Sequence, residues 1–342
     1  MKAVVFHEHG DVDKLVYGEA NDPKISPYEV LVKVKACALN HLDIWVRQGL
    51  RGIEIPMPHI LGSDIAGEIA EVGTEVKKFR AGDRVVIAPG VRCRKCVYCN
   101  TNRDSMCEKF KIMGFQVQGG YAELAKAHVD NIIPVSEKLS FEEWAAVPLV
   151  FLTAWHMIIS KAKIKPGECV LIHAAGSGIG SAAIQIARLA GASVIATARG
   201  AEKREKAKQL GADEIIDYSK EDYAEKAKSL THNKGVDVIF EHIGTDTWEK
   251  NLQCLAKGGR MSVCGITSGP TATIDIRSLF MRQHVIYGCY MGSKKELLDV
   301  LNLVESGRLK PVIDSVFPLQ KAKEAHQRML NRDNFGKIIL EI

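Results

Sequence analysis

The sequence predicts an α/β protein with two domains, one rich in β-strands and one built on a doubly wound parallel sheet. Its 342 residues are more than a single hydrophobic core usually supports. The first third carries short strand-like segments separated by glycines, which is typical of a small barrel or sandwich. From residue 168 onward, short apolar segments alternate with helical ones, as in a parallel sheet with helices on both faces.

Composition narrows the function classes. The net charge of +5 comes from 46 Lys and Arg against 41 Asp and Glu, which is too mild to indicate a nucleic-acid partner. No apolar run is long enough to cross a bilayer, and the first residues lack the pattern of a signal peptide. The odd count of nine cysteines argues against a disulfide framework. We therefore expect a cytoplasmic enzyme that acts on a small molecule, with no nucleic-acid or membrane partner.

The first domain is predicted from strands with a period of two. Residues 30–36 alternate apolar and polar side chains, and residues 3–6, 65–72 and 83–88 extend the pattern. A helix over residues 294–305 and a closing strand over residues 338–342 are expected at the end of the chain.

The second domain is predicted from strands over residues 168–173, 193–197, 214–217, 236–240 and 260–264. Helices are expected between them over residues 181–190 and 201–210. Short, continuously apolar strands that alternate with helices indicate a parallel sheet that is buried on both faces.

Four of the cysteines fall in one short stretch, at the spacing typical of a metal site. Four thiolates in tetrahedral geometry complete the shell of a structural zinc ion and leave no position for water or substrate. Two disulfides, an iron–sulfur cluster or thiol chemistry are the alternatives. Nearby Arg92, Arg94, Lys95 and Arg103 are expected to favour the thiolates. The other five cysteines are interpreted as packing residues. The predicted ligands are Cys93, Cys96, Cys99 and Cys107.

A glycine-rich turn follows the strand at residues 168–173. Free N–H groups at a helix N-terminus bind phosphate, and glycines allow close approach. The strict G-x-G-x-x-G pattern is not met, because Ser181 stands in its last place, but the strand–turn–helix context favours a dinucleotide site over simple packing. The predicted cofactor-binding residues of the turn are Gly176, Ser177, Gly178, Ile179 and Gly180.

The choice of cofactor is expected after the next strand, where a carboxylate would select NAD(H). No acid follows residues 193–197 directly; Arg199 stands there instead, with Lys203 one helical turn later. We interpret both as ligands of a 2′-phosphate and predict NADP(H), with NAD(H), and two merely solvated cations, as the alternative.

Several motifs together resemble the medium-chain dehydrogenase/reductase superfamily, which includes zinc-containing alcohol dehydrogenases and quinone oxidoreductases. They are the block from His59 to Gly67, the Ala81-Gly82-Asp83 turn, the cysteine stretch, the segment from Pro148 to Trp155, and Leu255 to Arg260. The resemblance implies a GroES-like catalytic domain over residues 1–149 with 288–342, a structural zinc lobe over residues 92–108, and a Rossmann domain over residues 150–287.

The resemblance also implies roles for single residues. Thr153 would contact the nicotinamide, Tyr218 would lie near the NADP phosphate, and Gly265 would belong to the cofactor site. Relatives pair through the edge of the Rossmann sheet, here residues 265–276, so a homodimer or homotetramer is expected.

Departures from the family pattern concern the catalytic zinc. Its ligand positions align with Asn40, Ser63 and Leu149, which are poor zinc ligands or none. A catalytic zinc of the usual kind is therefore not expected. An alternative site built from other residues stays open: Asp64, His41, His59 and Cys37.

These departures resemble the quinone oxidoreductase and enoyl reductase branch. The sequence thus predicts hydride transfer from NADPH to a quinone or an α,β-unsaturated carbonyl, with Asn40 orienting the reacting group and His41 or Asp64 relaying a proton. The alternatives are an alcohol dehydrogenase with atypical or absent zinc and a non-enzymatic NADPH-binding protein.

Histidines without a partner pattern, His326 among them, are expected to be solvated.

Overall fold

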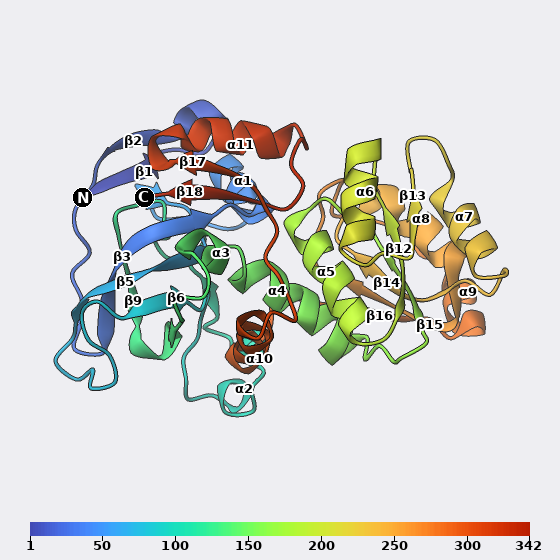
Figure 1. Ribbon diagram of the computed structural model, residues 1–342, viewed down its shortest axis with the longest axis horizontal. Helices are drawn as coiled ribbons and strands as arrows, with labels where there is room; N and C mark the ends of the chain where they lie inside the picture. The colour runs from blue at the N-terminus through green and yellow to red at the C-terminus, as the bar shows by residue number, and fades with distance from the viewer. The chain divides into compact units, whose positions relative to one another are not determined.

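The computed structural model describes residues 1–342 and separates into two units, each shown in Figure 1. The first contains Met1–Leu149 and Ser293–Ile342, and the second contains Val150–Gly292. The sequence predicted the second boundary at residue 288. The structure keeps residues 288–292 in the second unit, because Gly288 still pairs with Val263 at the edge of the parallel sheet.

The main sheet of the first unit has seven strands, in the order β10-β6-β5-β3-β18-β17, with β9 paired to β3. Alternate side chains of β3 are buried along most of its length, as its period of two predicted. The strands are β3 (Glu29–Ala38), β5 (Asp64–Val72), β6 (Arg84–Ile87), β9 (Leu124–His128), β10 (Ile132–Pro134), β17 (Ile313–Pro318) and β18 (Lys337–Glu341).

The remaining elements of the first unit cover this sheet. α3 contacts β3 and β5, and α11 contacts β17 and β18 (Figure 1). The first unit also contains a three-stranded sheet and a two-stranded sheet. The elements are β1 (Lys2–Phe6), β2 (Val16–Glu19), α1 (His41–Gln48), β4 (His59–Ile60), β7 (Gly90–Val91), α2 (Val97–Asn100), β8 (Lys111–Ile112), α3 (Phe141–Ala145), α10 (Lys294–Glu305) and α11 (Ala322–Leu330).

The second unit is a six-stranded parallel sheet in the order β13-β12-β11-β14-β15-β16. The strand order reverses between β11 and β14, where doubly wound folds bind their ligands. The strands are β11 (Cys169–Ile172), β12 (Ser193–Thr197), β13 (Glu214–Ile216), β14 (Val236–Glu241), β15 (Leu255–Val263) and β16 (Val285–Gly288).

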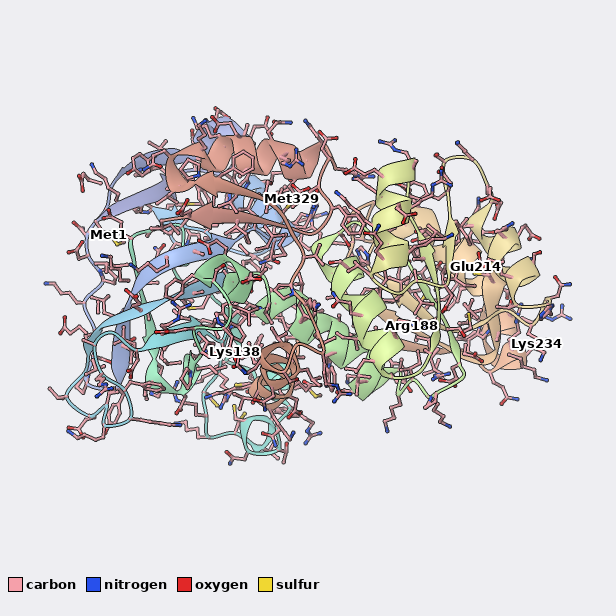
Figure 2. The ribbon with its side chains drawn as sticks, in the orientation of Figure 1. Met1, Lys138, Arg188, Glu214, Lys234 and Met329 are labelled. Carbon is pink, nitrogen blue, oxygen red and sulfur yellow. The ribbon has the colours of Figure 1, made fainter.

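Helices cover both faces of the parallel sheet, with α5 and α6 on one face and α7, α8 and α9 on the other (Figure 1). Right-handed crossovers require this division, because the chain winds outward from β11 in both directions. Charged side chains such as Arg188, Glu214 and Lys234 lie on the exterior (Figure 2). The helices are α4 (Pro148–Trp155), which begins in the first unit, α5 (Gly178–Leu189), α6 (Ala201–Gln209), α7 (Tyr223–Leu230), α8 (Thr245–Cys254) and α9 (Ile276–Arg282).

The predicted α/β fold class, with a β-rich unit and a doubly wound unit, is confirmed. One boundary differs instructively: the helix predicted from Ser181 begins at Gly178, because the Ser177 hydroxyl caps it by accepting from the N–H of Gly180 at 2.9 Å. None of the helices combines the length and apolar character needed to cross a bilayer.

Candidate active site

Strand register brings three distant segments of the first unit together. Ala38, at the end of β3, pairs with Asp64 of β5 on one side and with Ile339 of β18 on the other. Two residues later, Asn40 precedes α1, and its N–H donates to Asp43 Oδ2 at 2.8 Å. The side chains of Asn40, Asp64 and the first residue of β18, Lys337, therefore meet.

These three side chains form a closed, buried set of polar contacts. Lys337 Nζ donates to Asn40 Oδ1 at 2.6 Å and to Asp64 Oδ2 at 2.9 Å. Asn40 Nδ2 donates to the same Asp64 oxygen at 2.9 Å, and the other oxygen accepts from Leu149 N at 2.8 Å. The exposed fractions are 5% for Asn40, 0% for Asp64 and 3% for Lys337, so the ion pair lies away from solvent.

The donor set at this position does not fit a catalytic zinc. The oxygens of Asn40 and Asp64 already bind an ammonium group, and Leu149 offers only a backbone N–H. Ser63 turns away and donates its hydroxyl to Met113 O at 2.7 Å. The alternative set of Asp64, His41, His59 and Cys37 does not come together either, because the four cysteines of the lobe are the one cluster of candidate metal ligands in residues 1–342.

A second buried group lies behind Asn40. Asp43 accepts from Gly62 N and from the Tyr121 hydroxyl, both at 3.1 Å, and burial raises its pKa to about 6. The Tyr121 hydroxyl also contacts His326 Nε2 at 3.3 Å. His326 is 0% exposed, so the prediction of a solvated histidine is wrong, and burial lowers its pKa to about 3. Asp43 thus holds the turn before α1 against Gly62 and Tyr121.

His41 is the first residue of α1 and packs edge-on against the Trp45 ring, with centroids 5.0 Å apart. It does not join the contacts of Asn40 that are described above. Its role as a proton relay stays a prediction.

The four predicted sulfur ligands converge. The Sγ atoms of Cys93, Cys96, Cys99 and Cys107 all lie within 4.8 Å of one another. Cys99 Sγ lies 3.8 Å from Cys93 Sγ and 3.5 Å from Cys96 Sγ. Zinc–sulfur bonds of about 2.3 Å in a tetrahedron place sulfurs about 3.8 Å apart, so the cluster fits a structural zinc ion. Backbone N–H groups of Lys95 and Cys96 lower the pKa of Cys93 to about 6.

The cations around this lobe have other partners than the thiolates. Arg92 pairs with Asp104, with 3.4 Å from Nε to Oδ1, and Arg94 pairs with Asp130 at 3.6 Å from Nε to Oδ2. Arg103 lies over the Tyr98 ring, 5.2 Å from its centroid. The guanidinium groups of Arg92 and Arg94 thus bind carboxylates, and their electrostatic effect on the thiolates stays a prediction.

In the second unit, the glycine turn joins β11 to α5 at the strand-order reversal. The first N–H groups of α5, at Gly178 and Ile179, have no partner within the helix by its geometry. A Cβ on Gly180 would lie 2.4 Å from the carbonyl oxygen of Ala174, so only glycine allows this close approach. The free N–H groups at the start of α5 fit a phosphate, and its binding by Gly176 to Gly180 stays a prediction.

The predicted specificity residues lie at the carboxyl ends of neighbouring strands. Thr197 of β12 pairs with Ile216 of β13, so Arg199 and Tyr218 each follow that pair by two residues. Both are exposed, Tyr218 at 47%, and Lys203 is half-buried in the first turns of α6. Sequence reasoning missed Asp217, a buried acid between Ile216 and Tyr218 that lies 3.8 Å from Arg204 Nε.

Gly265 and Thr153 also belong to the second unit. Gly265 follows β15, and a Cβ there would lie 2.5 Å from the carbonyl oxygen of His242, which follows β14. Thr153 lies in α4 at 4% exposure, and its hydroxyl is buried without a hydrogen-bond partner. An unsatisfied buried hydroxyl is what a ligand amide would complete.

Comparison with known proteins identifies the family. Residues 26–137 match the alcohol dehydrogenase GroES-like domain, and residues 178–306 match the zinc-binding dehydrogenase family. The quinone oxidoreductase of Mus musculus is 33% identical over 350 residues, covering 99% of this chain and 97% of that protein. The chain belongs to the medium-chain dehydrogenase/reductase superfamily. It is accordingly an oxidoreductase of this superfamily.

Similar proteins within the superfamily are named either alcohol dehydrogenase or quinone oxidoreductase. The alcohol dehydrogenase of Geobacillus stearothermophilus is 32% identical, covering 95% of each chain. A solved NAD-dependent alcohol dehydrogenase is 42% identical with a TM-score of 0.96, covering 100% of both chains. The quinone oxidoreductase of Pseudomonas syringae pv. Tomato DC3000 is 30% identical with a TM-score of 0.86, covering 100% of this chain and 99% of that one. The GroES-like and Rossmann-like domains are thereby confirmed.

Sequence reasoning missed Lys337. A signal was present, because a lysine begins the strongly apolar strand Lys-Ile-Ile-Leu-Glu and its side chain has to leave the core or find an acid inside it.

Proposed function

We propose that the protein is an NADP(H)-dependent reductase of quinones or α,β-unsaturated carbonyls that works without a catalytic metal. The contact of Lys337 Nζ with Asn40 and Asp64 carries the proposal. This contact places an ammonium group against Asn40, one of the residues that the resemblance aligns with a ligand of the catalytic zinc.

The chemistry follows from what a metal would supply. Reduction of a saturated ketone leaves an alkoxide whose charge a Lewis acid stabilises. An enone delocalises the charge itself: hydride adds to the β-carbon, the C=C pair forms a double bond between the α-carbon and the carbonyl carbon, and the C=O pair moves to oxygen. A proton then adds to this enolate. A quinone spreads the charge over its ring in the same way. Bound reduced nicotinamide would supply the hydride. Asn40 would orient the carbonyl, with Asp64 and Lys337 fixing the amide, and His41 or Asp64 would relay the proton.

The cofactor proposal rests on three groups of the second unit. The α5 N-terminus would bind the pyrophosphate, and the unsatisfied Thr153 hydroxyl would bind the carboxamide of the nicotinamide. Arg199, with Lys203 and Tyr218 close along the sheet edge, would bind a 2′-phosphate. The cysteine lobe would hold one structural zinc ion whose role is to fix the fold of residues 92–108.

An NAD-dependent alcohol dehydrogenase is the second candidate. It is favoured by the name of the solved relative at 42% identity and by the retained cysteine lobe. In that case the metal would have to displace Lys337 from Asn40 and Asp64, which costs two hydrogen bonds and the ion pair.

Metal content together with a substrate panel separates the two. We expect about one zinc per chain, by the four-thiolate count, and turnover of quinones or enones with NADPH that exceeds alcohol oxidation with NAD. Two zinc ions per chain, with the second lost together with activity on brief chelation, would overturn the metal-free proposal.

We also propose that two or four copies assemble through the edge of the parallel sheet. β16 is an edge strand, and the adjoining α9 exposes Ile276, Phe280 and Met281 at 69%, 65% and 55%. Apolar side chains beside an open strand edge are typical of an interface between copies. Sedimentation velocity should show a dimer or tetramer. A cytoplasmic location completes the proposal.

A further inference from the structure

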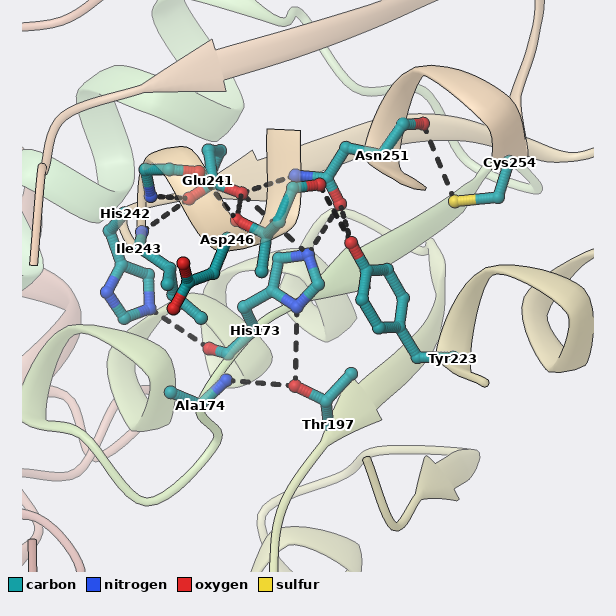
Figure 3. A network of polar contacts seen from close by, with 12 residues as sticks. His173, Ala174, Thr197, Tyr223, Glu241, His242, Ile243, Asp246, Asn251 and Cys254 are labelled. Atoms are coloured by element: carbon teal, nitrogen blue, oxygen red, sulfur yellow. Dashed lines mark hydrogen bonds and ion pairs between the residues drawn. The ribbon is translucent and has the colours of Figure 1, made fainter. Parts of the chain in front are cut away.

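A buried polar network lies beneath the glycine turn of the second unit (Figure 3). It links Glu241, at the end of β14, to Asn251 of α8, to His173 after β11 and to Thr197 at the end of β12. These side chains are each at most 1% exposed. Strands β11 and β14 are the pair between which the strand order reverses.

Glu241 is surrounded by donors. Its Oε1 accepts from the backbone N–H groups of Ile243 and Gly244, and its Oε2 accepts from Thr247 Oγ1 at 2.8 Å and from Asn251 Nδ2. Thr247 Oγ1 also lies 3.2 Å from Gly244 O, so its single hydrogen has two possible acceptors. An amide at position 241 would place an NH2 donor against these N–H groups.

The direction of the hydrogen bonds then follows along the network. Because Asn251 Nδ2 donates to Glu241, its Oδ1 is the acceptor for His173 Nε2 at 2.7 Å. His173 is therefore protonated at Nε2, and its Nδ1 accepts from Thr197 Oγ1 at 3.4 Å. Burial lowers the pKa of His173, which agrees with a neutral ring.

The network ends on the backbone of the turn. Thr197 Oγ1 accepts from the N–H of Ala174 at 3.1 Å, while His242 Nε2 donates to the carbonyl of His173 at 3.0 Å. Both polar atoms of the peptide group between His173 and Ala174 are thus held. Ala174 has φ +47°, a left-handed conformation that a non-glycine residue adopts only where its surroundings impose it.

The position of Ala174 in turn determines where α5 begins. Its carbonyl accepts from Ser177 N at 2.8 Å, and it approaches Gly180 so closely that a Cβ there would clash. The N-terminus of α5, with the N–H groups that would receive a pyrophosphate, is therefore fixed through Ala174.

We propose that Glu241, acting through Asn251, His173 and Thr197, positions the pyrophosphate-binding turn and thereby sets the affinity for the dinucleotide. These four are positioning residues and are not placed in contact with the substrate. The inference rests on the proposed cofactor site. It differs from the Arg199 proposal because the pyrophosphate is common to both dinucleotides.

Thr197 offers the sharpest test. Thr197→Val keeps the shape of the side chain but removes the oxygen that accepts from Ala174 N, whereas Thr197→Ser keeps that oxygen. We expect Thr197→Val to weaken binding of NADPH and NADH alike by about tenfold, the usual effect of one lost hydrogen bond with an unsatisfied partner. The ratio of the two affinities and kcat at saturating cofactor should stay near their wild-type values, and Thr197→Ser should restore binding.

Glu241→Gln is an independent variant that introduces a donor among four donors, and the same loss is expected. Tyr223→Phe is the matched control, because it removes a hydroxyl from Asn251 Oδ1 but leaves the path to Ala174 intact. Fluorescence titration gives the affinities, and thermal melting shows that each variant is folded.

The outcomes separate the two proposals. Unchanged affinity in folded Thr197→Val or Glu241→Gln would overturn the positioning role, as would a loss in Tyr223→Phe equal to theirs. If the wild-type protein binds neither dinucleotide, the proposed function itself fails.

Discussion

Two places in the first unit align with the metal sites that the resemblance to zinc dehydrogenases implies, and they differ in what holds them together. The cysteine lobe, residues 92–108, gathers four sulfurs from one short segment within 4.8 Å of one another. The Asn40 site gathers an amide, a carboxylate and an ammonium from three distant segments. When its thiols are deprotonated, the lobe carries negative charge that a bound cation would neutralise. The Asn40 site already contains its cation, because Lys337 neutralises Asp64.

The difference teaches that charge in a buried site can be balanced by a group of the chain itself, here the Lys337 ammonium against Asp64. Asp64 is 0% exposed and would be costly to bury alone. Lys337 meets that requirement from within the chain. The two sites should therefore respond in opposite ways to metal removal and to charge-changing substitutions.

The largest effect is expected at the lobe. Cys96→Ser removes one of four zinc ligands and should lower the metal content from about one zinc per chain to near zero. Residues 92–108 should then lose protection from hydrogen exchange. Mass spectrometry of bound metal and of amide exchange measures both.

Cys169→Ser, which alters a half-buried thiol of β11, should leave the metal content unchanged. Full zinc retention in Cys96→Ser would contradict a four-sulfur site.

The next largest effect is expected at Lys337. Lys337→Met leaves the buried carboxylate of Asp64 without its counter-ion and should reduce the free energy of unfolding of the first unit by about 3–5 kcal/mol. Adding Asp64→Asn to Lys337→Met should recover much of that loss, since both charges are then gone. Chemical denaturation followed by tryptophan fluorescence measures these changes.

Lys323→Met, an exposed lysine on α11, is the control and should change stability by no more than about 0.5 kcal/mol. If Lys337→Met is as stable as this control, the buried ion pair does not carry the charge balance of the site.

Sequence reasoning succeeded where the signal is local. The period of two in β3, the alternation of strands and helices after residue 168, and the cysteine spacing each depend on neighbours along the chain. The absence of a catalytic zinc at Asn40 stays a prediction, because it was inferred from one residue type at one aligned position.

What failed depends on contacts between distant residues. Lys337 meets Asn40 across 297 positions of the chain. The apolar strand that follows this lysine indicates only that it needs an acid, not which residues it meets. His326 reads as a polar residue, but it shares the buried face of α11 with Ala322 and Ala325. The path from Glu241 to Thr197 joins four elements that only the fold brings together.

The free energy of unfolding is expected to depend on pH through His326, which contacts Tyr121 behind the Asn40 site. Its folded pKa is lowered to about 3 by burial, below the ordinary 6.5. The neutral ring thus stabilises the fold fully above pH 6.5, and this contribution is lost as the pH falls. Relative to His326→Gln, the wild-type protein should lose about 2 kcal/mol between pH 7 and pH 5.

Asp43 acts in the opposite sense, because its raised pKa gives stability at low pH that is lost as the pH rises through about 6. It is present in both proteins of that comparison, so its contribution cancels in the difference. Melting curves of the pair across pH measure the effect, and a difference that does not vary with pH would show that the imidazole is not held neutral by burial.

The smallest effect is expected where charge is exposed. Arg199 lies at the surface, so water and salt screen it in a way that they do not screen Lys337. Arg199→Asp replaces attraction for a 2′-phosphate with repulsion and should shift the ratio of NADPH to NADH affinity by about tenfold, which is about 1.4 kcal/mol.

Lys234→Asp makes the same charge change in the loop before β14, at the amino edge of the sheet, and should not alter the ratio. An unchanged ratio in Arg199→Asp would remove the basis for NADP(H) while leaving the buried charge balance of Asp64 and Lys337 untouched. Steady-state KM values for both cofactors, measured at low and at high salt, decide the matter, because screening should shrink only the Arg199 effect.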